Sequence, residues 1–170
     1  MAPVAVLIGP PAAGKSAVGP LLAEHLGTRF RDTDADIAAA SGQPVSDIFI
    51  EQGEPAFRQL EREAAARALR EHDGVLALGS GSVLDPDLPH RLEGLPVVYL
   101  AADFAAVARR LGLDRPHIVI PGNPRGRLRA MLAERRPLYE RLATITVKTD
   151  DLDPDELAQE IAVQLNERQR

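Results

Sequence analysis

The chain has 170 residues, a length that fits one domain with a sizeable core, so we expect a single domain over residues 1–170. Its net charge of −5 argues against a nucleic-acid partner, because binding a phosphate backbone needs a basic face. The sequence has no cysteine, which excludes disulfides and thiolate chemistry and agrees with a cytoplasmic location; its longest charge-free run, residues 1–14, is too short to cross a membrane.

Five short apolar runs alternate with helical patterns along the chain. The runs cover residues 4–9, 28–34, 74–79, 96–100 and 143–147. The first, third and fourth are almost purely apolar, as is typical of strands buried on both faces. Because alternating strands and helices indicate βαβ units, we predict an α/β fold with a central five-stranded parallel sheet between two layers of helices.

The helical segments carry their own start and stop signals. Leu21, Leu22 and Leu26 form an apolar stripe on a first helix, which we expect to stop at Gly27. A long helix is predicted from about residue 53 to 72, and two more over about 124–139 and 154–166. Residues 111–126 contain three Pro and three Gly and are predicted to form a mobile loop.

The stretch GPPAAGKS, residues 9–16, fits the pattern of a phosphate-binding loop at every fixed position. It follows a buried strand and opens the first helix, so its backbone N–H groups would surround the β-phosphate of ATP. Lys15 would bridge the β- and γ-phosphate oxygens, and the Ser16 hydroxyl would hold Mg²⁺. The predicted nucleotide-contacting residues here are Gly9, Pro11, Ala12, Ala13, Gly14, Lys15, Ser16 and Ala17.

Two carboxylates follow the second predicted strand. Asp32 and Asp34 flank Thr33, and the two-residue period of a strand would place both on one side. In a parallel sheet that end of the strand lies beside the phosphate-binding loop. One carboxylate can therefore reach Mg²⁺ through water, while the other can accept a proton from an attacking hydroxyl.

Further motifs follow in a fixed order after the phosphate-binding loop. They are Asp32-Thr33-Asp34 with Ile37, Gly53-Glu54 with Phe57-Arg58 and Glu61, Gly79-Ser80-Gly81, Arg115-Pro116, and Arg135-Arg136-Pro137-Leu138-Tyr139. In order and approximate spacing the chain resembles the shikimate kinases over nearly its whole length. The loop alone is generic, whereas the two arginine motifs together with Asp-Thr-Asp are specific.

This resemblance implies a P-loop kinase fold with a mobile lid over about residues 111–126. It also implies that the enzyme, with Mg²⁺, transfers the γ-phosphate of ATP to the 3-hydroxyl of shikimate, on the route to chorismate and aromatic amino acids. We expect the protein to be a monomer. Asp34 would activate the attacking hydroxyl, and Asp32 would join Ser16 at the metal.

The remaining site residues are also implied by the resemblance. Arg58 and Arg135 would clamp the acceptor's carboxylate with the planar fork that lysine lacks. Backbone groups of Gly79, Ser80 and Gly81 would lie close to the ring. Three more residues would serve the nucleotide: Arg115 would close on its phosphates during transfer, while Arg110 and Pro154 would enclose its adenine.

Two departures and three alternatives accompany this interpretation. Ser80 stands where the family has a glycine; a positive φ there would cost about 1 kcal/mol, and its side chain could press on the acceptor. His117 and Ile118 follow Pro116 where the family usually has two leucines.

The alternatives are a related kinase for another hydroxy acid such as gluconate, a nucleotide kinase, and a non-catalytic nucleotide-binding module.

Overall fold

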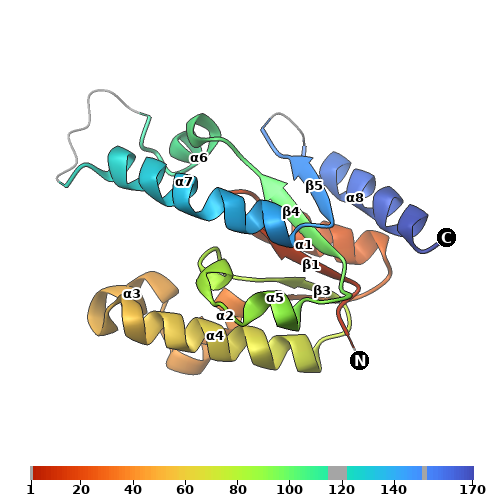
Figure 1. Cartoon of the computed structure of the whole chain (residues 1–170), viewed down its shortest axis with the longest axis horizontal. Helices are drawn as coiled ribbons and strands as arrows, with labels where there is room; N and C mark the ends of the chain where they lie inside the picture. The colour runs from red at the N-terminus through yellow and green to blue at the C-terminus, as the bar shows by residue number, and fades with distance from the viewer. Residues whose placement is uncertain (1, 115–121, 151–152) are drawn as a thin grey trace.

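The structure is a computed structural model that describes residues 2–114, 122–150 and 153–170 (Figure 1). Its sheet has five strands in the order β2-β3-β1-β4-β5, and every neighbouring pair is parallel. The strands are β1 (Ala5–Ile8), β2 (Phe30–Asp32), β3 (Val75–Ala77), β4 (Val97–Ala101) and β5 (Ile145–Lys148). The predicted five-stranded parallel sheet is therefore confirmed.

Helices connect the strands and cover the sheet. They are α1 (Lys15–His25), α2 (Thr33–Ser41), α3 (Val45–Gln52), α4 (Glu54–Glu71), α5 (Leu88–Arg91), α6 (Phe104–Arg110), α7 (Pro124–Leu142) and α8 (Pro154–Arg168). A short 3-10 helix, η1 (Ser82–Leu84), follows β3. In the described ranges no helix is both long and apolar enough to span a membrane.

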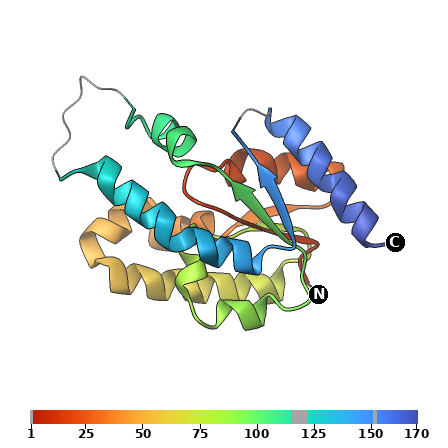
Figure 2. The ribbon, with the colours of Figure 1, turned by 45° about the horizontal axis from the view of Figure 1, so that its top comes forward.

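Two hydrophobic cores lie on opposite faces of the sheet, because alternate strand residues point to opposite sides. Ala5 and Leu7 of β1 pack with α1 and α8, whereas Val6 and Ile8 pack with α4, α5 and α7. Figure 2 shows α8 beside α1 on one side of the strands, with α4, α5 and α7 on the other. The result is the predicted three-layer α/β/α arrangement.

Most predicted helices lie where the sequence places them, with ends that differ by a few residues. The first helix ends at His25, two residues before Gly27, whose φ of 65° is left-handed. The segment between β2 and α4 differs more, because it holds two helices, α2 and α3, that the sequence analysis did not predict individually. They form a small third core with α4, built on Ile37, Ile48 and Phe57.

The carboxyl ends of all five strands share one edge of the sheet, as parallel pairing requires. The phosphate-binding loop follows β1 at that edge. Its neighbours there are α2, which starts directly after β2, and the turn of residues 79–81, which follows β3. Ligand sites of open parallel sheets lie at this edge, beside the strand where the chain order reverses, and here that strand is β1.

Candidate active site

The phosphate-binding loop is held against the neighbouring strand. A side chain at Gly9 would put its Cβ 2.6 Å from the backbone oxygen of Leu100 in β4, so only glycine fits there. Ala12 has a φ of 61°, in the left-handed region that is uncommon outside glycine. Such backbone conformations persist where the surrounding structure enforces them, and they cluster at ligand sites.

Lys15 turns back over its own loop. Its Nζ donates hydrogen bonds to the backbone oxygens of Gly9, at 2.6 Å, and Pro10, at 3.0 Å. Burial lowers the pKa of Lys15 to about 8, although Asp34 and Asp32 act in the opposite direction. An anion such as a phosphate would compensate this cation and raise its pKa again.

Ser16 and Asp32 lie together at the mouth of the loop. Ser16 Oγ donates to Asp32 Oδ2 at 3.4 Å, which brings the two expected Mg²⁺ ligands within reach of one ion. A hydroxyl and a carboxylate are oxygen donors of the kind that Mg²⁺ prefers, and the ion usually takes the rest of its ligands from phosphates and water. These two residues therefore fit a magnesium ion.

The Asp-Thr-Asp motif is a helix start rather than a strand end. The strand β2 stops at Asp32, whose Oδ1 caps α2 by accepting from the backbone N–H of Asp34 at 2.8 Å. The expectation that strand alternation places the two carboxylates on one side is thus wrong. Asp34 reaches the same cavity because it lies in the first turn of α2. Thr33 Oγ1 accepts from the backbone N–H of Gly79 at 3.1 Å and joins the two segments.

The cavity over the phosphate-binding loop has a volume of about 450 Å³. Its lining consists of Pro11, Ala12, Ala13, Gly14, Lys15, Ser16, Ala17, Asp32, Asp34, Leu78, Ser80 and Arg110. Arg110 bridges two loops across it, with Nη1 donating to the backbone oxygen of Ala12 at 2.9 Å and Nη2 to that of Thr149 at 2.7 Å. Gly9 does not line this cavity, and neither does Pro154, which starts α8.

A second, larger cavity of about 780 Å³ adjoins the first and opens between α3–α4 and α7, which face each other in Figure 1. It is lined by Pro11, Asp34, Val45, Ser46, Phe49, Ile50, Glu54, Phe57, Arg58, Glu61, Ser80, Arg127, Ala130, Met131, Glu134 and Arg135. We call it the acceptor cavity. Its lining includes three arginines, one from α4 and two from α7, and the phenylalanines Phe49 and Phe57.

Arg58 is already neutralised by its neighbours. Its Nη1 lies 2.5 Å from Glu61 Oε1, one helical turn away, and its Nε lies 3.5 Å from Glu54 Oε1. The guanidinium also lies over the Phe57 ring, 5.4 Å from its centroid. A Cβ on Gly81 would overlap Arg58 Nη1, so glycine at this position of the turn after β3 leaves room for the guanidinium where it lies.

Arg135 differs from Arg58 because no carboxylate of the described residues forms a salt bridge with it. It is only 7% exposed, and within the described ranges its guanidinium forms no salt bridge. Nη1 donates to Ser80 Oγ at 3.3 Å, while the buried Nε has no hydrogen-bond partner. A buried cation is costly unless an anion compensates it, so this side chain favours a negatively charged ligand.

Ser80 is not strained. Among the described residues only Ala12 and Asn123 have a positive φ outside glycine, so the expected backbone cost of a serine at this position is absent. Its hydroxyl accepts from Arg135, and its backbone oxygen accepts from Tyr139 Oη at 2.7 Å. The residue that departs from the family pattern is therefore bonded to α7 at two atoms.

Asp34 lies at the boundary of the two cavities. Burial, with Asp32 and Glu61 nearby, raises the pKa of its carboxyl to about 6, against smaller effects of Lys15 and Arg58. Its Oδ1 is buried and has no hydrogen-bond partner in the described structure. A carboxyl with a pKa near neutrality and a vacant oxygen is suited to accept a proton from a substrate hydroxyl.

Three residues line both cavities: Pro11, Asp34 and Ser80. One cavity lies over the phosphate-binding loop, and the other contains Arg58, Arg127 and Arg135 together with Asp34. A phosphate held by the loop and a hydroxyl held beside the arginines would thus meet at Asp34. The arrangement suits phosphoryl transfer from a nucleotide to a small anionic acceptor.

Known proteins share both the sequence and this architecture. The family model described as "Shikimate kinase" matches residues 11–166. The chain belongs to the shikimate kinase family. A shikimate kinase of Thermobifida fusca is 53% identical over 163 residues, covering 96% of this chain and 95% of its own. One of Salinispora arenicola is 50% identical over 165 residues, covering 97% and 99%.

A solved structure of a family member extends the likeness to three dimensions. The shikimate kinase from Acinetobacter baumannii in complex with shikimate superposes with a TM-score of 0.87 at 33% identity, covering 100% of this chain and 95% of that one. The family assignment made from the motifs is therefore confirmed, and so is the α/β fold of the family.

Within this family frame, the structure gathers nearly all of the predicted site residues around the two cavities. Arg115 lies outside the described residues, as do all of residues 115–121 of the predicted lid. Some cavity residues carry no sequence signal of their own. Arg127 of α7 adds a third cation to the acceptor cavity, and Thr149 binds Arg110, yet neither belongs to a recognisable motif. Phe49 and Ile50 belong to α3, a helix that was not predicted.

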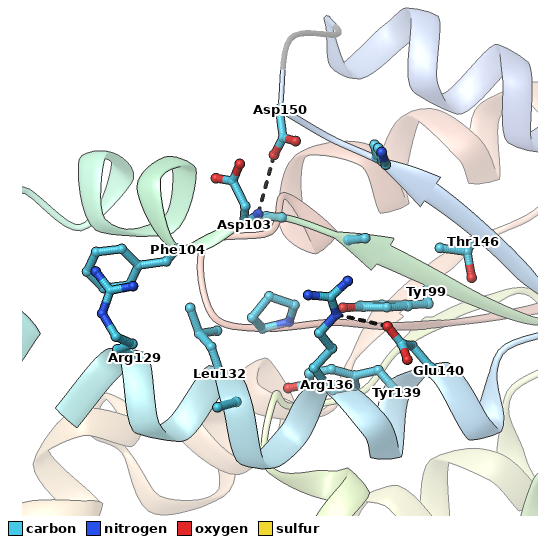
Figure 3. Close-up of a pocket in the computed structure, with 15 residues that line it drawn as sticks. Tyr99, Asp103, Phe104, Arg129, Leu132, Arg136, Tyr139, Glu140, Thr146 and Asp150 are labelled. Atoms are coloured by element: carbon cyan, nitrogen blue, oxygen red, sulfur yellow. Dashed lines mark hydrogen bonds and ion pairs between the residues drawn. The ribbon is translucent and has the colours of Figure 1, made fainter. Parts of the chain in front are cut away.

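A further cavity of about 440 Å³ lies between β4–β5 and α6–α7 (Figure 3). Tyr99 stacks on Tyr139 in its wall, 5.2 Å between ring centroids. Arg136 pairs with Glu140 at 2.9 Å, and Arg129 lies over the Phe104 ring. Of the predicted site residues none lines this cavity, which touches the phosphate-binding loop only through Pro10.

Proposed function

We propose that this protein transfers the γ-phosphate of ATP to the 3-hydroxyl of shikimate, giving shikimate 3-phosphate and ADP. Membership of the shikimate kinase family supports this activity. The observation in the site that carries it is Arg135, a buried cation without a carboxylate partner in the described structure, in a cavity that adjoins the phosphate-binding loop. A buried guanidinium of this kind favours an acceptor that carries a carboxylate, as shikimate does.

The transfer itself would take place at Asp34. The oxygen of the acceptor hydroxyl forms a bond to the γ-phosphorus, while the bond from that phosphorus to the oxygen bridging the β-phosphate breaks. The hydroxyl proton passes to the Asp34 carboxylate, which has to be ionised before the reaction. The raised pKa of about 6 allows ionisation at neutral pH and also makes the group a better base than an ordinary aspartate.

The phosphate side would be served by the loop. Lys15 would leave the backbone oxygens of Gly9 and Pro10 to bind the β- and γ-phosphates. Ser16 and Asp32 would hold Mg²⁺, Asp32 through water, and the ion would neutralise charge on the phosphates when bound. Arg110 would lie beside the adenine, because it spans the loop and Thr149. We propose Pro154 and Arg115 as further nucleotide-binding residues from the family resemblance alone.

The acceptor side would divide its work between two arginines. Arg135 supplies uncompensated positive charge, while Arg58, held by Glu61, supplies directed N–H donors with less net charge. Backbone groups of Gly79, Ser80 and Gly81 would line the ring. We further propose that the protein acts as a monomer of one domain, and that it works in the cytoplasm, where its co-substrate ATP is made.

An acceptor panel tests the proposal. ADP release is followed with ATP and Mg²⁺ in the presence of shikimate, quinate, gluconate or a nucleoside monophosphate. We expect turnover with shikimate, much less with the others, and a phosphate on the 3-hydroxyl by NMR of the product. Preferred turnover of gluconate or of the monophosphate would replace the proposed acceptor. ATP binding without turnover of any acceptor would indicate the non-catalytic module.

A further inference from the structure

Ser80 makes a side-chain contact in the site that the family's glycine could not make. Its hydroxyl accepts from Arg135 Nη1 at 3.3 Å, and its backbone oxygen accepts from Tyr139 Oη at 2.7 Å. The two donors lie one helical turn apart on α7, so they share one face of that helix. A glycine would keep the contact with Tyr139, which uses backbone only, and would lose the contact with Arg135.

Arg135 is a side chain for which a fixed orientation matters. Its long side chain can adopt many rotamers, whereas the planar fork recognises a carboxylate only when it faces the anion correctly. Within the described residues no carboxylate forms a salt bridge with it, and the Ser80 hydroxyl accepts a hydrogen bond from its Nη1. This contact uses one N–H of the guanidinium and leaves the remaining donors for a ligand.

We propose that the Ser80 hydroxyl is a positioning residue for acceptor binding: it holds the Arg135 guanidinium in place, so that the arginine meets the acceptor's carboxylate already oriented. This role rests on the proposed function, since it presumes a carboxylated acceptor in that cavity. Ser80 also lines the phosphate cavity, so the residue lies where acceptor and nucleotide meet. Preorganisation of this kind strengthens binding by lowering the ordering cost.

Substitutions at position 80 separate the hydroxyl from the backbone contact. Ser80→Ala keeps the Cβ and the bond from Tyr139 and removes only the hydroxyl, whereas Ser80→Thr keeps an acceptor oxygen. Ser82 is the matched control. The residue lies two positions away and is 3% exposed, and its hydroxyl has no hydrogen-bond partner in the described structure. Ser82→Ala removes the same atom from the same turn without touching Arg135.

The test measures KM and kcat for each variant with shikimate and ATP. For Ser80→Ala we expect the shikimate KM to rise about three- to tenfold, with kcat within about twofold and the ATP KM unchanged. Ser80→Thr should recover most of the loss, and Ser82→Ala should match the wild type. An active wild type whose shikimate KM does not change in Ser80→Ala, or improves, overturns the positioning role alone. A wild type that does not phosphorylate shikimate overturns the proposed function instead.

A double-mutant cycle then asks whether Ser80 acts through Arg135. If it does, Ser80→Ala should change the shikimate KM by less than about twofold in an Arg135→Lys background. The same loss in both backgrounds would mean that the hydroxyl contacts the acceptor independently of Arg135, and would overturn the proposal. Nitrogen-15 NMR of the Arg135 side chain provides a readout without acceptor: its Nη signal should be sharper in wild type and Ser80→Thr than in Ser80→Ala. Equal signals in all three would contradict the contact.

Discussion

Charged groups of both signs surround the Asp34 carboxyl. Its carboxyl is desolvated and lies near two other acids, Asp32 and Glu61, while Lys15 and Arg58 partly compensate it. Lys15 carries the reciprocal environment, because burial and Arg135 lower its pKa while Asp34 and Asp32 raise it. The two ionisable groups thus titrate on either side of neutrality, which is where a proton acceptor and a phosphate-binding cation can both be in their active forms.

A pH profile should show both groups. As the proposed proton acceptor, Asp34 would be inactive when protonated, so we expect kcat/KM to fall as the pH drops through about 6. Lys15 binds phosphate only as a cation, so kcat/KM should fall again as the pH rises through about 8. The measurement is steady-state kinetics between these limits and beyond, at constant ionic strength. A flat profile across the acid limb would exclude Asp34 as the base.

Replacing Asp34 by asparagine should affect activity and stability in opposite directions. Turnover should fall by about 10²- to 10⁴-fold, because the amide cannot take the proton, while ATP binding persists. The folded-state pKa of Asp34 is above its unfolded value of 3.8. Ionisation of Asp34 therefore lowers the free energy of unfolding as the pH rises through about 6.

Asp34→Asn should therefore raise the melting temperature at pH 8 by a few degrees, corresponding to about 1–2 kcal/mol after allowance for partial exposure. At pH 3, below the unfolded-state pKa of 3.8, the carboxyl is largely protonated in both states, so the gain should shrink. Calorimetry at both pH values checks this. An equal gain at both would show that the ionised carboxyl is not the cause.

The two acceptor-binding arginines should respond differently to lysine. Arg135 has no carboxylate partner in the described structure, so Arg135→Lys should raise the shikimate KM by about 10- to 100-fold through loss of the planar fork. In Arg58→Lys the substituted side chain still has Glu61 and Glu54 beside it, and a smaller rise is expected. Neither should change nucleotide affinity, measured by calorimetry. Shikimate carboxamide is the matched ligand: a wild type that phosphorylates it as well as the acid has no carboxylate clamp.

At the scale of elements, the acceptor cavity is built where three segments converge. Helix α4 brings Arg58 and Glu61, the turn after β3 brings residues 79–81, and α7 brings Arg135 and Tyr139. The turn passes so close to α4 that a Cβ on Gly81 would overlap the Arg58 guanidinium. A bond from α7 to the Ser80 backbone closes the third side.

Gly81→Ala should therefore damage binding more than folding. The new methyl group has to displace Arg58, so we expect the shikimate KM to rise by at least about tenfold. Gly94→Ala is the control, because Gly94 has a φ of 78° and nothing within 4 Å of its Cβ direction, between α5 and β4 at the opposite edge of the sheet. That control should lose thermal stability and keep its KM. If Gly81→Ala keeps its KM as well, Arg58 does not contact the acceptor.

Sequence patterns predicted the strands and missed the start of α2, and both outcomes have a physical cause. The strands β1, β3 and β4 are short apolar runs whose residues are almost all buried, a pattern that local sequence records well. At Asp32 the chain could continue as a strand or begin a helix. The aspartate cap and the acids of the first turn favoured the helix, a signal that was present in the sequence and was not used.

On the scale of the molecule, the site features that could be predicted are those that depend on neighbouring residues in the sequence. Contacts between residues far apart in the sequence could not be predicted. The phosphate-binding loop is a local motif, so its position and neighbours could be predicted. The contact of Ser80 with Arg135 joins residues 55 positions apart, and no local pattern records it. The cavity contacts of Arg127 depend on the rotation of α7, and Pro154 starts α8 without lining the phosphate cavity.

The described surface also supports the expectation of a monomer. Its exposed large apolar side chains are Phe49, Ile50, Leu111 and Val163, and the first two line the acceptor cavity. Stable dimers usually bury a larger continuous apolar area than such scattered side chains provide. Light scattering after size exclusion should give a mass close to 18.3 kDa. A concentration-independent mass of twice that value would contradict the expectation.

The residues shared by the two cavities, Pro11, Asp34 and Ser80, link the affinities of the two substrates. A ligand in either cavity would contact groups that also face the other, so we expect each substrate to change the affinity of the protein for the other. Thermodynamic reciprocity then requires one number: the factor by which a non-hydrolysable ATP analogue changes the Kd of shikimate equals the factor by which shikimate changes the Kd of that analogue. Two calorimetric titrations, one in each order of addition, should give the same factor. That factor measures how strongly the shared residues couple the binding of ATP to the binding of shikimate.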